Sequence, residues 1–413
     1  MTDLPRDPWP DATLPILRDP YRYVGRRAAE LGSDGFETRL MGRPATCLTG
    51  PEAAKLFYAQ GNFSRRGAIP GRIASVIFGN GVVQSMDGEA HRHRKAMHLG
   101  LMDEAGLARM DEIAAREWEA RLPRWREAGG LDLYPEMRLL LTRAACDWAG
   151  VSLERGEESW AEPLLTDLFS DAGAVGLKHQ TGLNARARAR EWMGGHIAAI
   201  RAAEPEGRGE EETVALRRIA LWRDLDGAFL PQDAAADELL SETRPIVAAA
   251  LYIAHLGHAL HAHPGHRQAV AEDEAAAHDF AQEVRRLYPF FPMLAGIAAR
   301  DLDWRGARIP QGRRVILDIY GTNRDARAWA DPDAFRPDRF RGWPGDPFTM
   351  IPQGGGDHAK GHRCPGEWMT IRLMAAFARR LAALGWEMRG APEGPDMRAL
   401  PADYPGGLRL APG

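Results

Sequence analysis

The chain has 413 residues, of which 45% are hydrophobic and 27% are charged. A chain of this length and composition can bury a large core, in one large domain or in two smaller ones. The formal net charge of −4 argues against a global basic surface for nucleic acid or anionic membranes, so we expect no nucleic-acid partner.

The cysteines and the first residues bear on the location of the protein. Cys47, Cys146 and Cys364 have no CxxC spacing, so they do not indicate a disulfide framework. Residues 1–10 lack the apolar stretch of a signal peptide, and no run approaches the ~18 apolar residues of a membrane helix. We therefore expect a cytoplasmic protein with no membrane span.

In chain order, the first predicted elements are an amphipathic helix at residues 21–32 and short strands within residues 36–48. Apolar residues at helical spacing then recur along the following part of the chain. The helices predicted there cover residues 52–60, 91–99, 105–127, 134–149, 158–172, 185–203 and 212–226. Residues 204–212 are polar and rich in Gly and Glu, which predicts a surface loop.

The longest helical pattern covers residues 233–262. Beyond it, the pattern predicts helices at 280–288 and 367–384, strands near 299–304 and 315–319, an irregular segment at 336–363, and coil with a hairpin from 391 onward. No repeat, heptad pattern or linker-like shift in composition interrupts the chain. These observations predict a single domain, residues 1–413, that is mainly α with a small β portion.

Cys364 lies in a glycine-rich turn directly before the helix predicted at 367–384. Glycines allow a backbone to pass close to a flat ligand, while the adjacent His362 and Arg363 and the start of a helix favour a thiolate. A thiolate on a rigid loop suits a soft metal centre. The alternative is an ordinary buried thiol.

Two arginine-containing motifs precede this cysteine loop. Glu283 and Arg286 stand three positions apart on one predicted helix face, and Arg339 lies in a Pro-Asp-Arg-Phe stretch. In this order and spacing, the motifs resemble those of the cytochrome P-450 superfamily, although Asp338 stands where that family carries Glu. The resemblance implies a triangular, helix-rich haem-thiolate domain whose cofactor is haem b, with Cys364 as the axial ligand of the iron.

The middle of the longest helical pattern contains Arg244 and Pro245 in an almost wholly apolar stretch. No acid lies three or four positions from Arg244, and Glu242 points about 200° away around the helix. A buried, unpaired guanidinium costs several kcal/mol, so we expect a partner, and a ligand carboxylate in bidentate contact would provide one. The alternative is an arginine that reaches the surface or pairs with a distant acid.

The Arg-Pro pair and several other segments resemble the bacterial fatty-acid peroxygenase branch of the superfamily, over residues 19–384. These other segments are 83–91, 288–293, 318–323, 351–357 and 363–368. Superfamily monooxygenases deliver protons with an acid–threonine pair at the centre of this helix. Here no such pair follows Pro245, and Arg244 and Pro245 stand in its place. The resemblance therefore implies an oxidoreductase that uses hydrogen peroxide to hydroxylate long-chain fatty acids at Cα or Cβ, with no redox partner protein.

The same resemblance implies roles for three distal residues. The substrate carboxylate, held by Arg244, takes the place of the missing acid–base pair, and Pro245 is expected to kink the helix over the haem. Gln84 matches a distal position that carries Gln or His in the family. Because the resemblance associates Gln with hydroxylation, we expect decarboxylation to terminal alkenes to be minor. Taken alone, Gln84 would be an ordinary polar loop residue.

The remaining expected contacts lie at the haem edge and along the acyl chain. His91, Lys95 (in place of the family's arginine) and His362 are expected to contact the haem propionates, although each is otherwise a plausible surface cation. Aromatic side chains are more often simply core. The residues expected to line the acyl channel are Phe78, Phe290 and Phe291.

Two other functions remain open. A reductase-dependent haem-thiolate monooxygenase is disfavoured by the missing acid–threonine pair. A non-catalytic haem-binding protein would need neither Arg244 nor a distal Gln84. One assay separates the three hypotheses. Turnover with peroxide alone indicates a peroxygenase, turnover only with a reductase indicates a monooxygenase, and no turnover indicates a haem-binding protein.

Overall fold

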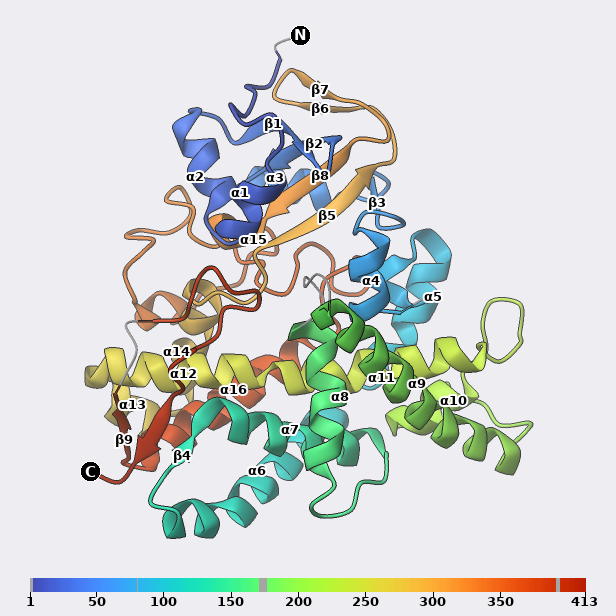
Figure 1. Cartoon of the computed structure of the whole chain (residues 1–413), viewed down its shortest axis with the longest axis vertical. Helices are drawn as coiled ribbons and strands as arrows, with labels where there is room; N and C mark the ends of the chain where they lie inside the picture. The colour runs from blue at the N-terminus through green and yellow to red at the C-terminus, as the bar shows by residue number, and fades with distance from the viewer. Residues whose placement is uncertain (1–2, 80, 171–176, 391–393) are drawn as a thin grey trace.

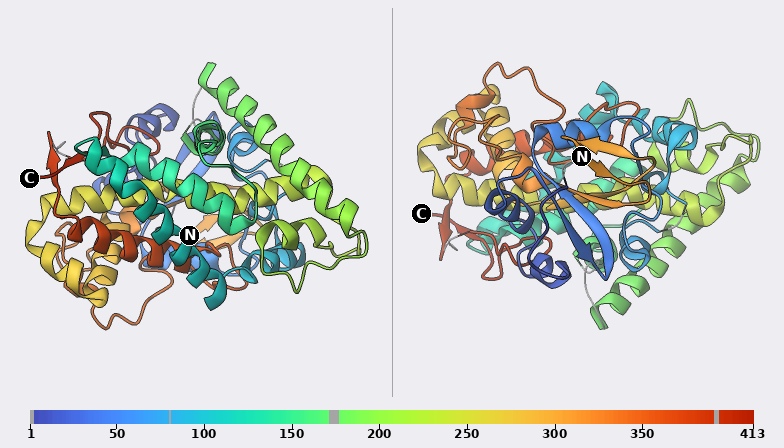
Figure 2. Two further views of the ribbon diagram at one scale, coloured as in Figure 1. Left: turned by 90° about the horizontal axis from the view of Figure 1, so that it is seen from below. Right: turned by 90° about the horizontal axis from the view of Figure 1, so that it is seen from above.

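The computed structural model describes residues 3–79, 81–170, 177–390 and 394–413 (Figure 1). A smaller, sheet-rich part lies at the top of Figure 1, and long helices spread out below it, which gives a roughly triangular outline. The views from below and above show the same broad helical layer on one side of the strands (Figure 2). The expectation of a mainly α protein with a small β portion is confirmed.

Helices make up most of the described chain. The first nine are α1 (Thr13–Arg18), α2 (Tyr23–Glu30), α3 (Pro51–Tyr58), α4 (Gly71–Ile77), α5 (Gly88–Leu99), α6 (Glu104–Glu127), α7 (Leu133–Ala149), α8 (Glu158–Ser170) and α9 (Leu177–Ala203). Several begin or end at residues suited to that place. Asp103 caps α6 by accepting from the Gly106 N–H, and α7 ends at Gly150, whose φ of 78° is left-handed.

The second half of the chain contributes the long central helices and the helix after the cysteine. These are α10 (Ala215–Leu221), α11 (Gln232–Ala248), α12 (Ala250–Ala262), α13 (Arg267–Glu272), α14 (Glu274–Leu287), α15 (Ile319–Thr322) and α16 (Glu367–Ala383). The short 3-10 helices are η1 (Val83–Ser85), η2 (Pro264–His266) and η3 (Pro337–Phe340).

The main sheet has five strands in the order β1-β2-β8-β5-β3. Its parallel pair joins β2 to β8, where Ala45 lies opposite Arg314, and the other three pairs are antiparallel. Its strands are β1 (Gly35–Leu40), β2 (Arg43–Leu48), β3 (Phe63–Ser64), β5 (Met293–Ala298) and β8 (Arg314–Asp318). Two small sheets contain β4 (Leu131–Asp132), β6 (Leu302–Trp304), β7 (Ala307–Ile309), β9 (Glu387–Arg389) and β10 (Arg409–Ala411).

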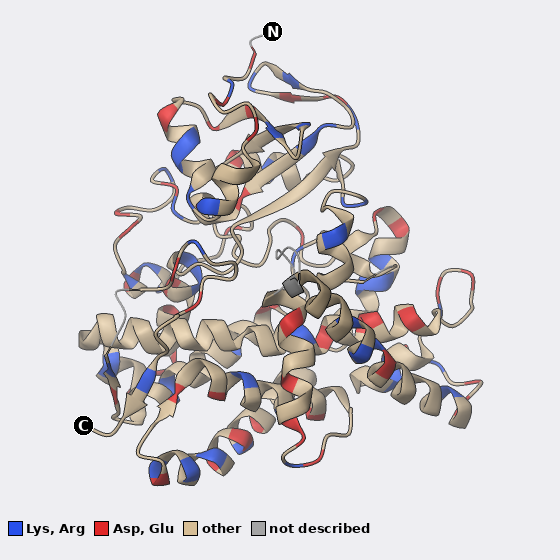
Figure 3. Cartoon of the chain, in the orientation of Figure 1, with Lys and Arg blue, Asp and Glu red and all other residues tan. Residues whose placement is uncertain are grey.

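The predicted 233–262 helix forms as two helices, α11 and α12, that meet at Ala249. Ala249 itself stays in the right-handed helical region, with φ of −61° and ψ of −14°, and its N–H donates to the carbonyl of Pro245 at 3.1 Å. A kink caused by Pro245, which has no N–H to donate, stays a prediction. The stretch Gln232–Ala262 is long and apolar enough to cross a membrane, but 83% of its most apolar window is buried inside the protein. We therefore assign it as a core helix. Figure 3 shows α12 without charged residues, as its buried position requires.

Several predicted boundaries were wrong. The helix predicted at 212–226 covers only Ala215–Leu221, because the flanking charged residues form ion pairs and Gly227 turns the chain with a φ of 80°. The segments that form α4, β5 and α13 were not predicted as elements. The apolar residues of β5 do not alternate with polar ones, so the period of a strand is missing from its sequence. The end of the helix predicted at 158–172 lies outside the described residues.

Candidate active site

The loop that carries Cys364 is held by its own backbone. The Cys364 N–H donates to the carbonyl of Gln353 at 3.0 Å, and Gln353 Nε2 lies 3.9 Å from Cys364 Sγ. Two residues later α16 begins, where the Glu367 N–H lies 3.4 Å from the carbonyl of Cys364. The cysteine is therefore placed at a helix start, as the sequence predicts.

The glycines before Cys364 allow the loop to pack on itself and on α3. A Cβ on Gly355 would stand 2.4 Å from the carbonyl oxygen of Pro347, and one on Gly356 would stand 2.8 Å from Tyr58 Cβ. Gly356 also has a φ of 75°, which a side chain disfavours. Close packing within the chain is enough to explain glycine at these two positions. That the loop also passes close to a flat ligand stays a prediction.

Arg285 connects α14 to the cysteine loop. Its Nη2 donates to Glu367 at 2.6 Å and to Gln353 Oε1 at 3.0 Å, and its side chain is 2% exposed. Arg363, expected to stabilise the thiolate, instead donates to Glu367 at 2.5 Å. Sequence reasoning missed Arg285 and Gln353, because nothing local marks a residue whose partners lie 68 and 82 positions away.

Glu283 and Arg286 form the ion pair expected from their spacing. Two bonds of 2.7 and 2.8 Å join them, and both side chains are fully buried. Arg339 Nε lies 3.3 Å from Glu283 Oε1, and the backbone N–H of Arg336 donates to the same oxygen at 2.7 Å. Arg286 also donates to the carbonyl of Pro332 at 2.7 Å, so α14 holds the irregular segment that precedes the cysteine loop.

The protein surroundings alone favour the thiol form of Cys364. Burial, and next the carboxylate of Glu367, raise the pKa of the Cys364 thiol to about 11. A metal that binds the sulfur would remove its proton outright. The described residues contain no cluster of three or more His, Cys, Asp or Glu side chains that could hold a metal ion. A single cysteine ligand fits haem, which brings its own four nitrogens, better than a bare ion.

Arg244 is 6% exposed and has no carboxylate partner among the described residues. Its Nε has no hydrogen-bond partner, and its Cζ lies 5.8 Å from the centre of the Phe78 ring. Glu242 binds His98 instead, as its position on the helix suggests. Burial, and next the charge of Arg186, lower the pKa of Arg244, whereas Cys364 acts in the opposite direction. Arg244 thus has an unfilled requirement for an anion.

Gln84 lies on η1, which is anchored to α11. The N–H of the preceding residue, Val83, donates to Glu238 Oε1 at 3.0 Å. Gln84 Oε1 is buried and has no hydrogen-bond partner. Phe78 and Gln84 therefore both lie near α11, the helix that carries Arg244. Arg244 Nε and Gln84 Oε1 are buried and have no hydrogen-bond partner in the described parts of the chain.

Two of the residues expected near the haem propionates, His91 and His362, pack against each other. The rings of His91 and His362 are 3.9 Å apart, and His362 Nε2 lies 3.8 Å from Asp87 Oδ1. Burial, and next the charge of His362, lower the pKa of His91 to about 3. A contact between His91 and a propionate stays a prediction.

Lys95, the third expected propionate contact, reaches the cysteine loop. Its Nζ donates to the carbonyl of Arg363 at 2.7 Å and also to that of Gly361. Burial lowers the pKa of Lys95 to about 8, with Cys364 opposing this shift. In this arrangement Lys95 braces the loop, and contact with a propionate remains a prediction.

The aromatic residues expected in the acyl channel have different surroundings. Phe290 stacks on Tyr252 of α12 with the ring centres 4.2 Å apart, while Phe291 is 48% exposed. Phe78 alone of the three contacts Arg244. The channel assignment of Phe290 and Phe291 stays a prediction.

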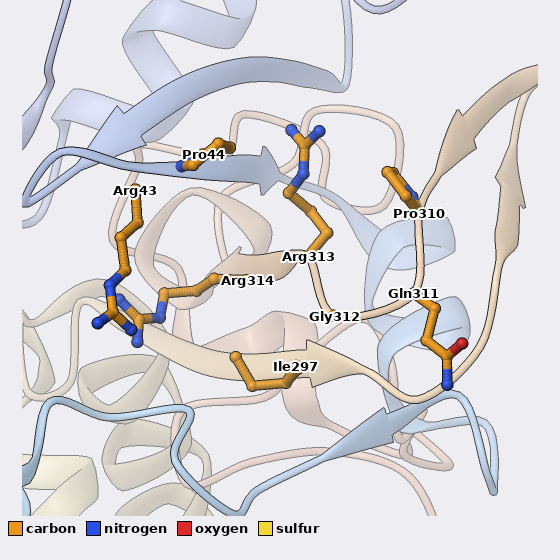
Figure 4. A pocket seen from close by; sticks show the side chains of 8 residues that line it. All are labelled: Arg43, Pro44, Ile297, Pro310, Gln311, Gly312, Arg313 and Arg314. Carbon is orange, nitrogen blue, oxygen red and sulfur yellow. The ribbon is translucent and has the colours of Figure 1, made fainter.

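A cavity of about 330 Å³ lies where β2 and β8 begin and β5 ends, apart from these residues (Figure 4). Arg43, Arg313 and Arg314 line it together with Gln311 and Ile297. It shares no residue with the Cys364–Arg244 site and takes no part in the chemistry derived for that site.

Comparisons with known proteins agree with this geometry. The family model for cytochrome P-450 matches residues 278–396, the segment that contains Glu283, Arg339 and Cys364. The structure of cytochrome P450SP alpha (CYP152B1) in complex with (R)-ibuprofen has a TM-score of 0.92 and 40% identity, covering 98% of both chains.

Two other solved structures are similar over nearly the whole chain. Cytochrome P450EX alpha (CYP152N1) with myristic acid has a TM-score of 0.92 and 34% identity, covering 100% of this chain and 99% of the other. A variant of OleT, a cytochrome P-450 in complex with arachidonic acid, has a TM-score of 0.94 and 32% identity, covering 99% and 98%.

Among curated proteins, the beta-amyrin 28-monooxygenase of Kalopanax septemlobus is 22% identical over 403 residues, 89% of this chain and 81% of that enzyme. Cytochrome P-450 84A4 of Arabidopsis thaliana is 34% identical over 115 residues. That match covers 26% of this chain and 21% of the plant enzyme, so it is confined to a fifth of the relative's length.

Proposed function

The chain belongs to the cytochrome P-450 family, and we propose that it is a peroxygenase that hydroxylates long-chain fatty acids with hydrogen peroxide. Two of the similar structures contain a fatty acid, myristic acid in one and arachidonic acid in the other. The cofactor is haem with Cys364 as its thiolate ligand. No redox partner protein is part of this proposal.

One observation carries the proposal. Arg244 is a buried cation on the central helix with no acid to neutralise it. A buried, unpaired charge is costly, and a planar guanidinium is well matched to a carboxylate. A fatty acid supplies that carboxylate, followed by an alkyl chain suited to an apolar site.

When bound, the haem supplies oxidising iron that inserts an oxygen atom from peroxide into a C–H bond. The chain's own residues determine which bond is presented. Arg244 fixes the carboxylate, so the first carbons after it, Cα and Cβ, are held nearest to the reacting centre. The overall change is R–H plus H₂O₂ to R–OH plus H₂O, and no external electron donor is needed.

The bound carboxylate also handles a proton. One carboxylate oxygen, held beside Arg244, accepts a proton from one oxygen of peroxide and returns it to the other. Pro245 has no N–H to compete for this oxygen. Gln84, whose buried amide oxygen has no hydrogen-bond donor in the described parts of the chain, would accept a hydrogen bond from peroxide or ordered water. The acid–base group thus arrives with the substrate, which explains why Arg244 and Pro245 stand where superfamily monooxygenases carry an acid–threonine pair.

The test is product analysis with purified holoenzyme, a saturated C12–C18 fatty-acid series and hydrogen peroxide, without a reductase. We expect 2- and 3-hydroxy acids from the long-chain substrates. Product only when a reductase system and NAD(P)H replace peroxide would indicate a monooxygenase. No product under either condition would indicate a haem-binding protein without turnover, and both outcomes contradict the proposal.

A further inference from the structure

We propose that Arg186 on α9 is a second cation of the carboxylate-binding site, so that the substrate's head group is held between two buried guanidinium groups. This inference rests on the proposed function. It adds to the carboxylate site a residue that the motifs do not mark.

Arg186 is buried without enough partners. It is 3% exposed, and neither Nη1 nor Nη2 has a hydrogen-bond partner in the described parts of the chain. Its contact is with Asp237 on α11, whose Oδ1 lies 3.2 Å from Arg186 Nε. Asp237 is shared, because Arg190 donates to both of its oxygens at 3.1 and 2.8 Å. One carboxylate therefore serves two guanidinium groups.

The position of Asp237 brings Arg186 toward Arg244. The two α11 residues are seven positions apart, which is close to two helical turns and therefore places them on the same face. Helix α9 packs along α11 and against α4. The terminal N–H groups of Arg186 thus lie beside the face of α11 from which Arg244 projects.

Two adjacent residues at the end of α4 contact both arginines. The Phe78 ring centre is 5.8 Å from Arg244 Cζ. A Cβ on Gly79 would stand 2.6 Å from Arg186 Nη2 and 2.0 Å from Asp237 Oδ2, and the φ of 81° at Gly79 also disfavours a side chain. The same dipeptide therefore lies against both guanidinium groups.

The carboxylate nearest to Arg186 is engaged mainly by another arginine. Arg190, which is partly exposed, donates to both oxygens of Asp237, whereas Arg186 reaches Asp237 through Nε and leaves Nη1 and Nη2 without a hydrogen-bond partner in the described parts of the chain. The next acid on α11, Glu238, binds Arg94 and His98. The charge of Arg186, after burial, lowers the pKa of Arg244, in agreement with this placement.

A fatty-acid carboxylate meets this requirement. It has two oxygens and about four acceptor positions, enough for N–H donors from two guanidinium groups. An alcohol or ester of equal chain length has no charge to offset the two like charges. With two arginines, the site should therefore bind the free acid in preference to the alcohol or ester more strongly than Arg244 alone would.

The test measures binding rather than turnover. Dissociation constants for tetradecanoic acid and tetradecanol are measured by calorimetry on the holoenzyme of wild type and of the variants Arg186→Gln, Arg190→Gln and Arg244→Gln. We expect Arg186→Gln to weaken acid binding at least tenfold and to leave alcohol binding within twofold. The control Arg190→Gln, which removes the other partner of Asp237, should change acid binding by less than threefold.

The double variant Arg186→Gln/Arg244→Gln separates a shared site from a structural effect. If both arginines hold one carboxylate, their effects on the dissociation constant are less than additive. If Arg186→Gln does not retain haem, Arg186→Lys, which keeps the charge, is used and should weaken acid binding only three- to tenfold. Additive effects, equal weakening by Arg190→Gln, or equal loss of alcohol binding would overturn the inference.

The outcomes also distinguish this inference from the proposed function. If Arg244→Gln weakens acid binding and Arg186→Gln does not, Arg186 has no role in binding and the proposed function stands. If neither variant weakens acid binding, the assignment of the carboxylate site itself is wrong.

Discussion

At the scale of single residues, the candidate site is marked by buried polar groups that lack a hydrogen-bond partner. Arg244 Nε and Gln84 Oε1 are both buried, and neither has a hydrogen-bond partner in the described parts of the chain. Most buried polar groups in proteins are hydrogen-bonded, so two such groups on neighbouring elements indicate where a ligand belongs. Around Cys364, by contrast, Arg285, Arg363 and Glu367 bond to one another and to Gln353.

Gln84 is expected to influence which product forms. With a long-chain fatty acid and peroxide, wild type should give mainly hydroxy acids, with terminal alkene and CO₂ as minor products. Gln84→His should raise the alkene fraction severalfold, because the resemblance associates His at this position with decarboxylation. Gas chromatography of the products measures the ratio, and dominant alkene from the wild type would refute this assignment.

Arg285 is expected to be the more important of the two arginines that bind Glu367. Arg285→Met would leave the buried Glu367 carboxylate short of a partner and should cost about 3 kcal/mol of unfolding free energy. Arg363→Met is the matched control. Its side chain is 17% exposed, so its loss should cost about 1 kcal/mol. Urea unfolding of the two holoenzyme variants provides the comparison, and equal losses would count against a special role for Arg285.

At the scale of elements, a buried ion network ties α5 to the central helix. His98 on α5 lies between two acids of α11, with Nε2 3.0 Å from Glu238 Oε2 and Nδ1 hydrogen-bonded to Glu242. Arg94 donates to Glu238 at 2.9 Å. This network uses the acids nearest to Arg244 and so leaves the arginine available for substrate.

The network makes stability depend on pH in a defined direction. Burial alone would lower the pKa of His98, but the carboxylates of Glu242 and Glu238 raise it to about 10. The unfolded value is about 6.5, so the proton stabilises the folded state fully below pH 6.5. That contribution is lost as the pH rises from about 6.5 to about 10.

The corresponding experiment compares wild type with His98→Gln. The difference between their urea unfolding free energies should be largest near pH 6 and should shrink steadily toward pH 10. Removing one member of a buried charged group typically costs about 3–5 kcal/mol, which sets the size of the difference at low pH. A difference that does not change with pH would show that His98 is not charged in the folded protein.

At the scale of the whole molecule, the parts that could be predicted from sequence are those with a local signal. Helices with a clear period, such as α6 and α7, were predicted to within one residue at each end. The spacing of Glu283 and Arg286 predicts the ion pair that forms. The isolation of Arg244 on its helix also follows from its neighbours in sequence.

Features that depend on distant parts of the chain could not be predicted in this way. Arg285 and Arg186 look like ordinary helix-surface arginines in sequence, and only packing against α16 and α11 shows their role. The strand β5 carries no alternation, because its pairing with β3 and β8 rather than its pattern makes it a strand. The glycines near Cys364 have their partners in Tyr58 and Pro347.

The central claim is that the substrate supplies the group that completes the site, through its contact with Arg244. The most direct measurement compares the rates of peroxide-driven hydroxylation of hexadecanoic acid and hexadecanol by the same wild-type holoenzyme. The two substrates have equal chain lengths and differ only in the head group. We predict that the acid reacts at least 100-fold faster. Comparable rates for the two substrates would contradict the claim.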